Sequence, residues 1–314
     1  MLLRILRQKH NYDFIKYRPL HVGLAVAAII ISFALLFVRG LNYGIDFKGG
    51  MLLEVKTAPG VTIHDIRTKT GELRLTSYSL QEFGSPDILL VRMDKDENQS
   101  PEQVLALVKN KYGAMVSEYR RVETVGPVVG GELKRSALWA ILAGVGMIFV
   151  YVWFRFEWQF ALGGMLALFH DVIVAAGFFS LTGIEFNLVS VAALLTIAGY
   201  SINDTVVIYD RLRENLRRFH KMSLNDMMNL SINETLSRTL LTSVTTLVSM
   251  LALALFGGSA IQDFGLVMVI GILVGTYSSI ALALPIVAYF SPRRGALGEG
   301  GGNGYAELFT KGKQ

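Results

Sequence analysis

The 314-residue chain contains no cysteine at all. Disulfide bonds, cysteine-ligated metal sites and thiol catalysis are therefore excluded. Charge is also scarce, because only 18% of the residues are Asp, Glu, Lys or Arg, against about 25% in an average soluble protein. The shortfall is concentrated in long stretches that carry almost no charge. Such stretches are typical of a protein that spans a membrane.

Hydrophobic residues, by contrast, make up 52% of the chain and gather in six apolar blocks. Each block reaches the length of roughly 17–25 residues that a helix needs to cross a bilayer. The sequence therefore predicts six transmembrane helices, at residues 20–38, 136–154, 158–182, 187–209, 236–256 and 264–290. The first block resembles a signal sequence, but Phe37-Val38-Arg39-Gly40 offers no small-residue cleavage site, so we interpret it as an uncleaved anchor.

Basic residues lie on alternate sides of these blocks. The short loops at 183–186 and 257–263 contain no Lys or Arg. On the other side, basic residues occur in 1–19, at Arg155, in 211–221 and at Arg293-Arg294. Because cytoplasmic loops are enriched in Lys and Arg, the N-terminal segment 1–19 and a flexible tail at 293–314 are both predicted to be cytoplasmic. This distribution accounts for the net charge of +5 without a nucleic-acid partner.

Residues 39–134, between the first and second blocks, mix both signs of charge with Gly, Pro and Asn turn signals. Strands are expected at 51–56, 77–83, 87–93 and 116–125, with helices at 61–74 and from Pro101 onward, N-capped by Thr62 and Ser100. The order βαββαβ is that of a ferredoxin-like unit. The predicted fold class is thus an α-helical membrane protein with six transmembrane helices. One ferredoxin-like α+β domain lies between helices 1 and 2, on the periplasmic side.

Four ionisable residues stand inside the apolar blocks, namely His170, Asp171, Asp204 and Arg238. A charge at bilayer depth costs about 2.5 kcal/mol or more on insertion scales, so such residues point into a bundle or a wet cavity. The chain reverses between the fourth and fifth blocks, so Asp204 and Arg238 can share a depth. We predict a proton pathway at these two residues, because a carboxylate can take up a proton when its cation moves away. The sequence also allows a buried ion pair that fixes helix registry.

Other polar residues follow these groups at helical spacing. In the fourth block, one face carries Thr196, Tyr200, Asn203 and Asp204. In the fifth block, one face carries Arg238, Thr242, Thr245, Thr246 and Ser249. We expect the two stripes to face each other as a polar seam. The candidates for additional proton-handling or structural polar sites are His170, Asp171, Asn203, Tyr200 and Thr242.

The sequence GIDFKGG at 44–50 follows the first block. It lacks the spacing of a phosphate-binding loop, and its Lys48 is not followed by Ser or Thr. We predict a hinge or tight junction here and at the other end of the domain. The junction residues are Gly44, Asp46, Phe47, Gly49, Gly50, Gly126 and Pro127. No catalytic residue, metal site or cofactor motif is predicted.

Five motifs, in this order, resemble the SecD/SecF family of bacterial protein-export membrane proteins, on its SecF side. They are GIDFKGG at 44–50, FRFEW at 154–158, HDV at 170–172, GYSINDTVVIYDRLREN at 199–215 and LSRTLLTS at 236–243. The resemblance covers about residues 12–292. One departure is Lys48, where several family members place a small polar residue.

The resemblance implies the fold of one half of a resistance-nodulation-division transporter, which the six spans of SecD complete. It implies an accessory subunit of the Sec protein translocase in the bacterial inner membrane, which uses the proton-motive force to promote late steps of protein export. The implied partners are SecD, the SecYEG channel, YidC, SecA, the translocating preprotein and the lipid bilayer. Family members use the Asp of a G-Y-S-x-N-D motif and the Arg of an R-T-L motif in proton transport. In this chain those residues are Asp204 and Arg238.

Three other interpretations stay open. A small-molecule efflux subunit driven by proton antiport shares the fold, and drug resistance without an export defect on deletion would favour it. An intramembrane aspartyl protease could use Asp171 and Asp204, but such families carry a G-x-G-D motif that neither residue matches. A purely structural assembly factor is the third, in which the buried charges only hold helices together.

Overall fold

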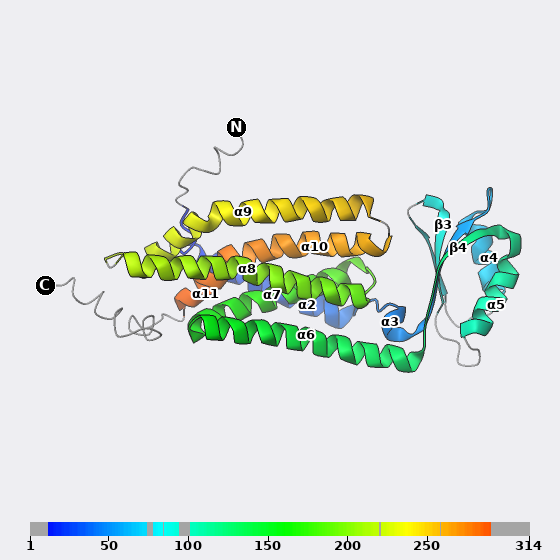
Figure 1. Ribbon diagram of the computed structural model, residues 1–314, viewed down its shortest axis with the longest axis horizontal. Helices are drawn as coiled ribbons and strands as arrows, with labels where there is room; N and C mark the ends of the chain where they lie inside the picture. The colour runs from blue at the N-terminus through cyan, green and yellow to red at the C-terminus, as the bar shows by residue number, and fades with distance from the viewer. Residues whose placement is uncertain are drawn as a thin grey trace, which may run out of the picture.

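The computed structural model describes residues 12–73, 78–83, 85–93, 101–219, 221–257 and 259–289. An elongated helical bundle carries a small α+β domain at one end (Figure 1). Several of the predictions lie outside the described residues. These are the tail at 293–314, most of the segment 1–19 and the N-cap Ser100.

Six helices of the bundle are long and apolar enough to cross a membrane, so the chain is a multi-pass membrane protein. They are α2 (Arg18–Val38), α6 (Pro127–Arg155), α7 (Trp158–Thr182), α8 (Leu188–Arg218), α9 (Leu224–Phe256) and α10 (Ser259–Ser278), which continues through the π-helical η2 (Ser279–Ala283) into α11 (Leu284–Tyr289). The prediction of six spans is confirmed. The helices α6, α8 and α9 extend beyond the predicted blocks, because apolar composition marks only the part of a helix that lipid surrounds.

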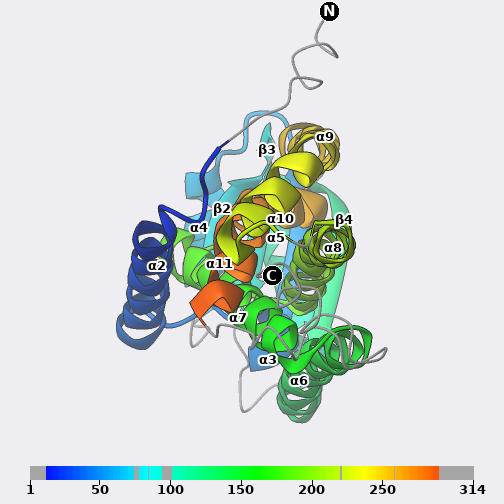
Figure 2. The ribbon, with the colours of Figure 1, turned by 90° about the vertical axis from the view of Figure 1, so that its left-hand side faces the viewer.

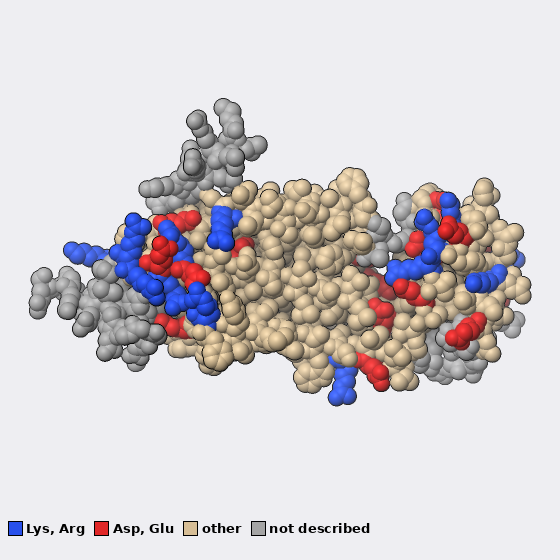
Figure 3. Space-filling view, viewed as in Figure 1, with Lys and Arg blue, Asp and Glu red and all other residues tan. Residues whose placement is uncertain are grey.

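The helices of the bundle differ in how much of their surface they bury. In α7, α8 and α10, half or more of the most apolar window is buried, whereas the outer helices α2, α6 and α9 bury less than a fifth. Figure 2 looks along the bundle from the end opposite the domain and shows α2, α6 and α9 at its outside. Charged residues gather at that end and on the domain, leaving the middle of the visible face uncharged (Figure 3). An uncharged middle band is the expected surface of a membrane-spanning bundle.

The α+β domain contains four strands in one antiparallel sheet. Its elements are β1 (Gly50–Thr57), α4 (Ile63–Gly71), β2 (Tyr78–Phe83), β3 (Ser85–Met93), α5 (Pro101–Tyr112), η1 (Gly113–Met115) and β4 (Val116–Val125). The sheet order β2-β3-β1-β4 and the element order βαββαβ are those of a ferredoxin-like unit. The fold class predicted from the sequence is therefore confirmed.

The two helices of the domain cover the face of the sheet that points away from the bundle (Figure 1). Alternate residues of β1, including Leu53 and Val55, point into the core between sheet and helices and are fully buried. They pack with Ile66 of α4 and Val108 of α5. Thr62 forms a capping box with Asp65 at the start of α4, which confirms the predicted N-cap. The opposite face of the sheet points toward the bundle.

Candidate functional site

Asp204 lies in α8 with its side chain turned into the bundle, and the residue is only 3% exposed. Its Oδ2 atom is buried and has no hydrogen-bond partner within the described part of the chain. A buried oxygen of an ionised carboxylate is costly when no donor reaches it. Asp204 is therefore in surroundings where taking up a proton, or the approach of a cation, would be favourable.

Arg238 of α9 is the cation that interacts electrostatically with Asp204. The arginine itself is exposed at the side of the bundle. Among the described residues, no hydrogen bond or ion pair joins it to Asp204. The structure thus places these two predicted residues within electrostatic range of each other, without a direct ion pair among the described residues.

The polar stripes of α8 and α9 differ from the expected inward-facing seam. Thr196 and Asn203 of α8 are exposed, as are Thr245 and Ser249 of α9. On α9 the hydroxyls bond to carbonyls of their own helix, as Thr245 Oγ1 does to the carbonyl of Leu241 at 3.0 Å. The physical reason is that α9 is an outer helix, so one side of its stripe meets no neighbour among the residues that the structure describes. Only part of the polar face turns inward.

That inward part joins α8, α9 and α10 by hydroxyl groups. Tyr200 Oη donates to Ser243 Oγ at 3.3 Å, and Ser243 in turn contacts Thr276 Oγ1 at 2.7 Å. Thr242, one of the predicted polar sites, instead donates to the carbonyl of its own neighbour Arg238 at 3.1 Å. Tyr200 is therefore placed to hold α8 against α9, whereas Thr242 only satisfies its own helix.

Asp171 lies at the centre of the bundle and is completely buried. Its Oδ2 atom accepts hydrogen bonds from Ser201 of α8 at 2.5 Å and from Ser278 of α10 at 2.6 Å. Its Oδ1 atom lies 2.9 Å from Nδ1 of the neighbouring His170. The sequence did not identify the two serines, because a serine in an apolar helix carries no pattern that marks its partner. The predicted polar residues His170 and Asp171 thus belong to one network that connects α7, α8 and α10.

The two buried aspartates have opposite surroundings. Both oxygens of Asp171 have partners, namely the hydroxyls of Ser201 and Ser278 and Nδ1 of His170. Asp204 has an Oδ2 atom without a donor in the described residues. The oxygens of Asp171 are occupied by Ser201, Ser278 and His170, so these contacts do not make a carboxyl dyad of the aspartyl protease kind. Asp204 is the carboxyl that is better placed to exchange a proton.

The GIDFKGG segment forms the short helix α3 (Ile45–Lys48) and a sharp turn into β1. Gly49 and Gly50 have φ angles of 78° and 132°, which only glycine adopts without strain. Asp46 Oδ2 accepts a hydrogen bond from the backbone N–H of Leu188, the first residue of α8, at 2.9 Å. Phe47 stacks on Phe186 with ring centroids 5.8 Å apart. These contacts tie the predicted junction to the start of the helix that carries Asp204.

The other end of the domain passes into the bundle without a loop. Gly126 is the N-cap of α6 in an extended conformation, and Pro127 stands in the first turn. Proline at that position has its fixed φ angle suited to a helix start. A Cβ on Gly130, one turn further, would lie 3.1 Å from the backbone nitrogen of Gly49. The two predicted junction segments therefore touch each other.

Gly44 makes room for an acidic side chain of the α7–α8 loop. A Cβ at this position would lie 2.3 Å from Oε1 of Glu185. Burial raises the pKa of the Glu185 carboxyl above its ordinary value, and the neighbouring Arg92 guanidinium opposes that rise. Sequence reasoning missed both residues, because β3 and the α7–α8 loop are far apart in the chain and neither shows a motif.

Comparison with known proteins identifies the family. A model of the C-terminal part of the SecD/SecF protein export membrane proteins matches residues 104–293, and a model of the SecD/SecF GG motif matches residues 34–61. The first match alone covers more than half of the chain. The chain belongs to the SecD/SecF family. The resemblance found in the five sequence motifs is therefore confirmed.

Individual SecD/SecF relatives agree with this assignment. Protein translocase subunit SecF of Rickettsia akari (strain Hartford) is 44% identical over 295 residues, which cover 93% of this chain and 96% of the relative. The subunit from Rickettsia prowazekii (strain Madrid E) is 41% identical, with 93% and 95% covered. Asp204, Arg238 and His170-Asp171 lie within the matched C-terminal region, and GIDFKGG lies within the GG motif.

Two solved structures of the family share the fold. The crystal structure of SecDF, a translocon-associated membrane protein from Thermus thermophilus, has a TM-score of 0.81 and 37% identity, over 90% of this chain and 39% of that chain. SecDF in a super-membrane-facing form gives a TM-score of 0.68 and 36% identity, over 93% and 40%. This chain therefore spans about two-fifths of those structures. The similarity also confirms that the bundle is of the resistance-nodulation-division type.

Proposed function

We propose that this chain is a protein translocase subunit that pairs with a SecD-type chain and uses the proton-motive force to promote late steps of protein export. The observation that carries the proposal is the state of Asp204, which is 3% exposed, has an unpartnered Oδ2 atom and lies in electrostatic range of Arg238. A carboxyl of this kind can alternate between a protonated form and a form paired with the arginine. The surrounding sequence belongs to the family's matched region.

Pairing with SecD is supported by the exposed polar face of the bundle. Arg238, Asn203, Thr245 and Ser249 are exposed on helices that cross the membrane. Polar groups at bilayer depth face a protein neighbour or a wet cavity, because lipid cannot satisfy them. The larger part of the SecDF structures, beyond the two-fifths that this chain spans, would supply that neighbour. The SecYEG channel, YidC and SecA are proposed further partners on the family resemblance alone.

The proposed orientation places the α+β domain in the periplasm of a bacterial inner membrane. Basic residues (Lys and Arg) gather at the bundle end opposite the domain, as Figure 3 shows. The C-terminal part of α8 carries Arg211, Arg213, Arg217 and Arg218. Excess positive charge marks the cytoplasmic side. Both chain termini are then cytoplasmic, and protons reach Asp204 from the side of the domain.

The proposed energy source is large enough for the task. One proton that crosses a potential of 100 mV releases about 2.3 kcal/mol. That is enough to bias two orientations of the domain by a factor of about 50. Protonation of Asp204 would weaken its interaction with Arg238, let α8 and α9 shift, and move the domain through the junction segments at 44–50 and 126–127.

The test is reconstitution of this chain with its SecD-type partner in vesicles that contain the translocation channel. Asp204→Asn and Arg238→Met should each abolish the stimulation of export completion by an imposed proton gradient. Asp210→Asn is the matched control, because Asp210 lies on the same helix and forms a partly exposed ion pair with Arg155. It should keep the stimulation. Normal proton-driven completion in both site variants, with the complex intact, would refute the proton role.

A further inference from the structure

The side chain of Arg92 lies on the face of the β-sheet opposite to the core of the α+β domain. It lies in β3 between Val91 and Met93, whose side chains are buried among the domain's helices. Because successive side chains of a strand point to opposite faces, Arg92 points toward the bundle. Its strand is paired on both edges, with Leu52 of β1 and Ser79 of β2 opposite Arg92. The guanidinium is therefore carried by one of the two strands of the sheet that are paired on both edges.

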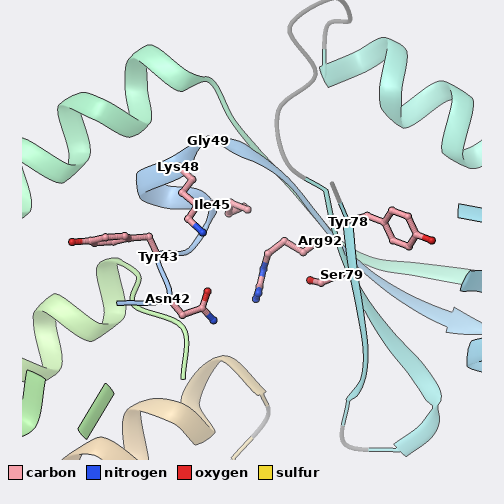
Figure 4. A pocket seen from close by; sticks show the side chains of 8 residues that line it. All are labelled: Asn42, Tyr43, Ile45, Lys48, Gly49, Tyr78, Ser79 and Arg92. Carbon is pink, nitrogen blue, oxygen red and sulfur yellow. The ribbon is translucent and has the colours of Figure 1, made fainter. Parts of the chain in front are cut away.

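The arginine side chain enters a cavity of about 180 Å³ between the domain and the bundle. Figure 4 shows it reaching from the sheet, beside Tyr78 and Ser79, toward the segment that carries Asn42, Tyr43, Ile45, Lys48 and Gly49. Its side chain is only 16% exposed. Arg92 therefore lines a cavity between the domain and the bundle and reaches across it toward the bundle.

Glu185 receives the guanidinium on the bundle side. Arg92 Nη2 donates to Glu185 Oε2, and the Glu185 side chain is also only 16% exposed. The loop that carries Glu185 is fixed to the GIDFKGG region by backbone bonds, from Phe186 N–H to the carbonyl of Asn42 at 2.7 Å and from Gly44 N–H to the carbonyl of Phe186 at 2.9 Å. The backbone of Ile45 gives the carboxylate a further hydrogen bond. The receiving carboxylate is thus held in place by several contacts.

Two more carboxylates surround the same point. Asp46 of α3 and Asp263 of α10 both act electrostatically on Glu185, and Asp263 also interacts with Arg92. Lys48 lines the cavity as well, but it is exposed to solvent. Arg92 is therefore a largely buried cation that pairs with Glu185 and interacts with Asp263, while Asp46 acts on the same Glu185 carboxylate. Like charges brought together without a counter-charge repel each other, and burial strengthens the repulsion.

Two of the three acids, Glu185 and Asp46, are tied to the start of α8. Glu185 lies three residues before Leu188, and Asp46 accepts the hydrogen bond of the Leu188 backbone N–H. From there α8 runs as one helix through Asp204, a rise of about 24 Å at 1.5 Å per residue. A shift of α8 along or about its axis therefore moves Glu185 and Asp46 with it.

We propose that Arg92 is the positioning residue that couples the α+β domain to α8, by seating its guanidinium among Glu185, Asp46 and Asp263. This inference rests on the proposed function only for its consequence in export. The anchoring itself is a property of the domain–bundle contact. Removal of the arginine leaves Glu185, Asp46 and Asp263 without this counter-charge. The domain then separates from its position against the bundle. Removal of Glu185 alone leaves Arg92 with Asp263, so the domain keeps its position against the bundle.

The anchoring can be measured as a distance between the domain and the bundle. This chain has no cysteine, so Asn110→Cys on α5 and Leu181→Cys on α7 give it one exposed pair for spin labels. The labelled chain is studied by pulsed electron spin resonance, in lipid vesicles with a cysteine-free SecD-type partner. Wild-type residues at the anchor should give one narrow distance distribution. Arg92→Gln should broaden and shift it, and Arg92→Lys should restore most of the narrow component.

Second-site and control variants separate anchoring from misfolding. Arg92→Gln combined with Glu185→Gln should return toward the wild-type distribution, because the repulsion is relieved. Arg121→Gln is the matched control, since Arg121 pairs with Glu123 on the same sheet and side chains of this pair are 39% exposed. It should leave the distribution unchanged. An unchanged distribution in Arg92→Gln, or a double variant no closer to wild type than Arg92→Gln alone, would overturn the anchor.

The role in export is tested in the same vesicles by proton-stimulated completion. Arg92→Gln should lose most of the stimulation, and the double variant should regain part of it. A broadened distribution combined with full stimulation would overturn the coupling role. That outcome would not affect the proposed function, which Asp204→Asn tests separately. Conversely, full activity of Asp204→Asn would refute the proton role and leave the measured anchor intact.

Discussion

Ser201 donates a hydrogen bond to Asp171 at 2.5 Å, and it lies one helical turn before Asp204 on the same face of α8. One helix therefore presents a donor to one buried carboxylate and carries a second carboxyl that has an unpartnered Oδ2 atom in the described residues. The first carboxylate is a fixed structural centre of the bundle. In the proposed function, the second carboxyl would change its protonation state without breaking that centre. This separation is what a proton-driven helix shift requires.

Substitution of the two aspartates should have unequal consequences for stability. Asp171→Ala leaves Ser201 and His170 without their buried partner, while Ser278 keeps its hydrogen bond to the carbonyl of Gly275, and unsatisfied buried groups cost about 1–3 kcal/mol each in soluble proteins. We expect a destabilisation of roughly 2 kcal/mol or more. Asp204→Asn removes a buried charge whose Oδ2 atom accepts no bond, so it should change stability by less than about 1 kcal/mol. Thermal unfolding of both variants in detergent checks this, and equal losses would contradict it.

Gly44→Ala should dislodge Glu185. The new Cβ would lie 2.3 Å from Glu185 Oε1 and 2.9 Å from its carboxyl carbon, closer than real contacts allow. The carboxylate must move, which separates it from Arg92 and costs about 1–3 kcal/mol. Gly126→Ala is the control, because a Cβ there meets nothing within 4 Å. Protease sensitivity of the domain–bundle junction should rise only in Gly44→Ala, and Glu185→Ala in that background should reverse it.

The fold followed from patterns that are local in the sequence. Apolar length gave the six spans, and alternation with turn residues gave the ferredoxin-like order, since each depends on neighbours within about twenty residues. Asp204 and Arg238 were identified for the same reason, because each is a charge within an apolar run. Ser201, Ser278, Arg92 and Glu185 were missed. Their importance comes from contacts between residues 30 to 107 positions apart, which no short pattern records.

The exposed side of the polar stripes shows a second limit of prediction from the sequence. Helical spacing placed Arg238, Thr245 and Ser249 on one face, but spacing cannot say which neighbour that face meets. In this chain the face is exposed. A sequence that folds as one part of a larger membrane assembly presents such a face to a chain that its own pattern does not contain.

Glu185 should make the domain contact depend on pH. Burial is the larger effect and raises the pKa of Glu185, although Arg92 acts against it. Glu185 then binds a proton more readily when the domain lies against the bundle than when it is separated. Acid therefore favours the domain–bundle contact. This contribution is complete below the ordinary carboxyl value of about 4.3 and is lost as the pH rises through the raised pKa. Spin-label distances between pH 4 and 7 check it. The pH dependence of these distances should be smaller in Glu185→Gln. Separation of the domain from the bundle on acidification would contradict the predicted direction.

Tyr112 of α5 should resist ionisation and stabilise the α+β domain. It is 1% exposed, and its hydroxyl lies 2.8 Å from Thr70 Oγ1. Burial raises its pKa to about 12, so the stability it gives is complete below about pH 10 and is lost as the pH rises through 12. Absorbance of ionised tyrosine in the full chain should show a late component that becomes smaller by one tyrosine in Tyr112→Phe. That variant should cost only about 1 kcal/mol, because Thr70 still donates to the carbonyl of Ile66. Tyr78→Phe is the control, since its hydroxyl makes only a 3.5 Å contact, and hydrogen exchange of α4 and α5 should increase in Tyr112→Phe alone.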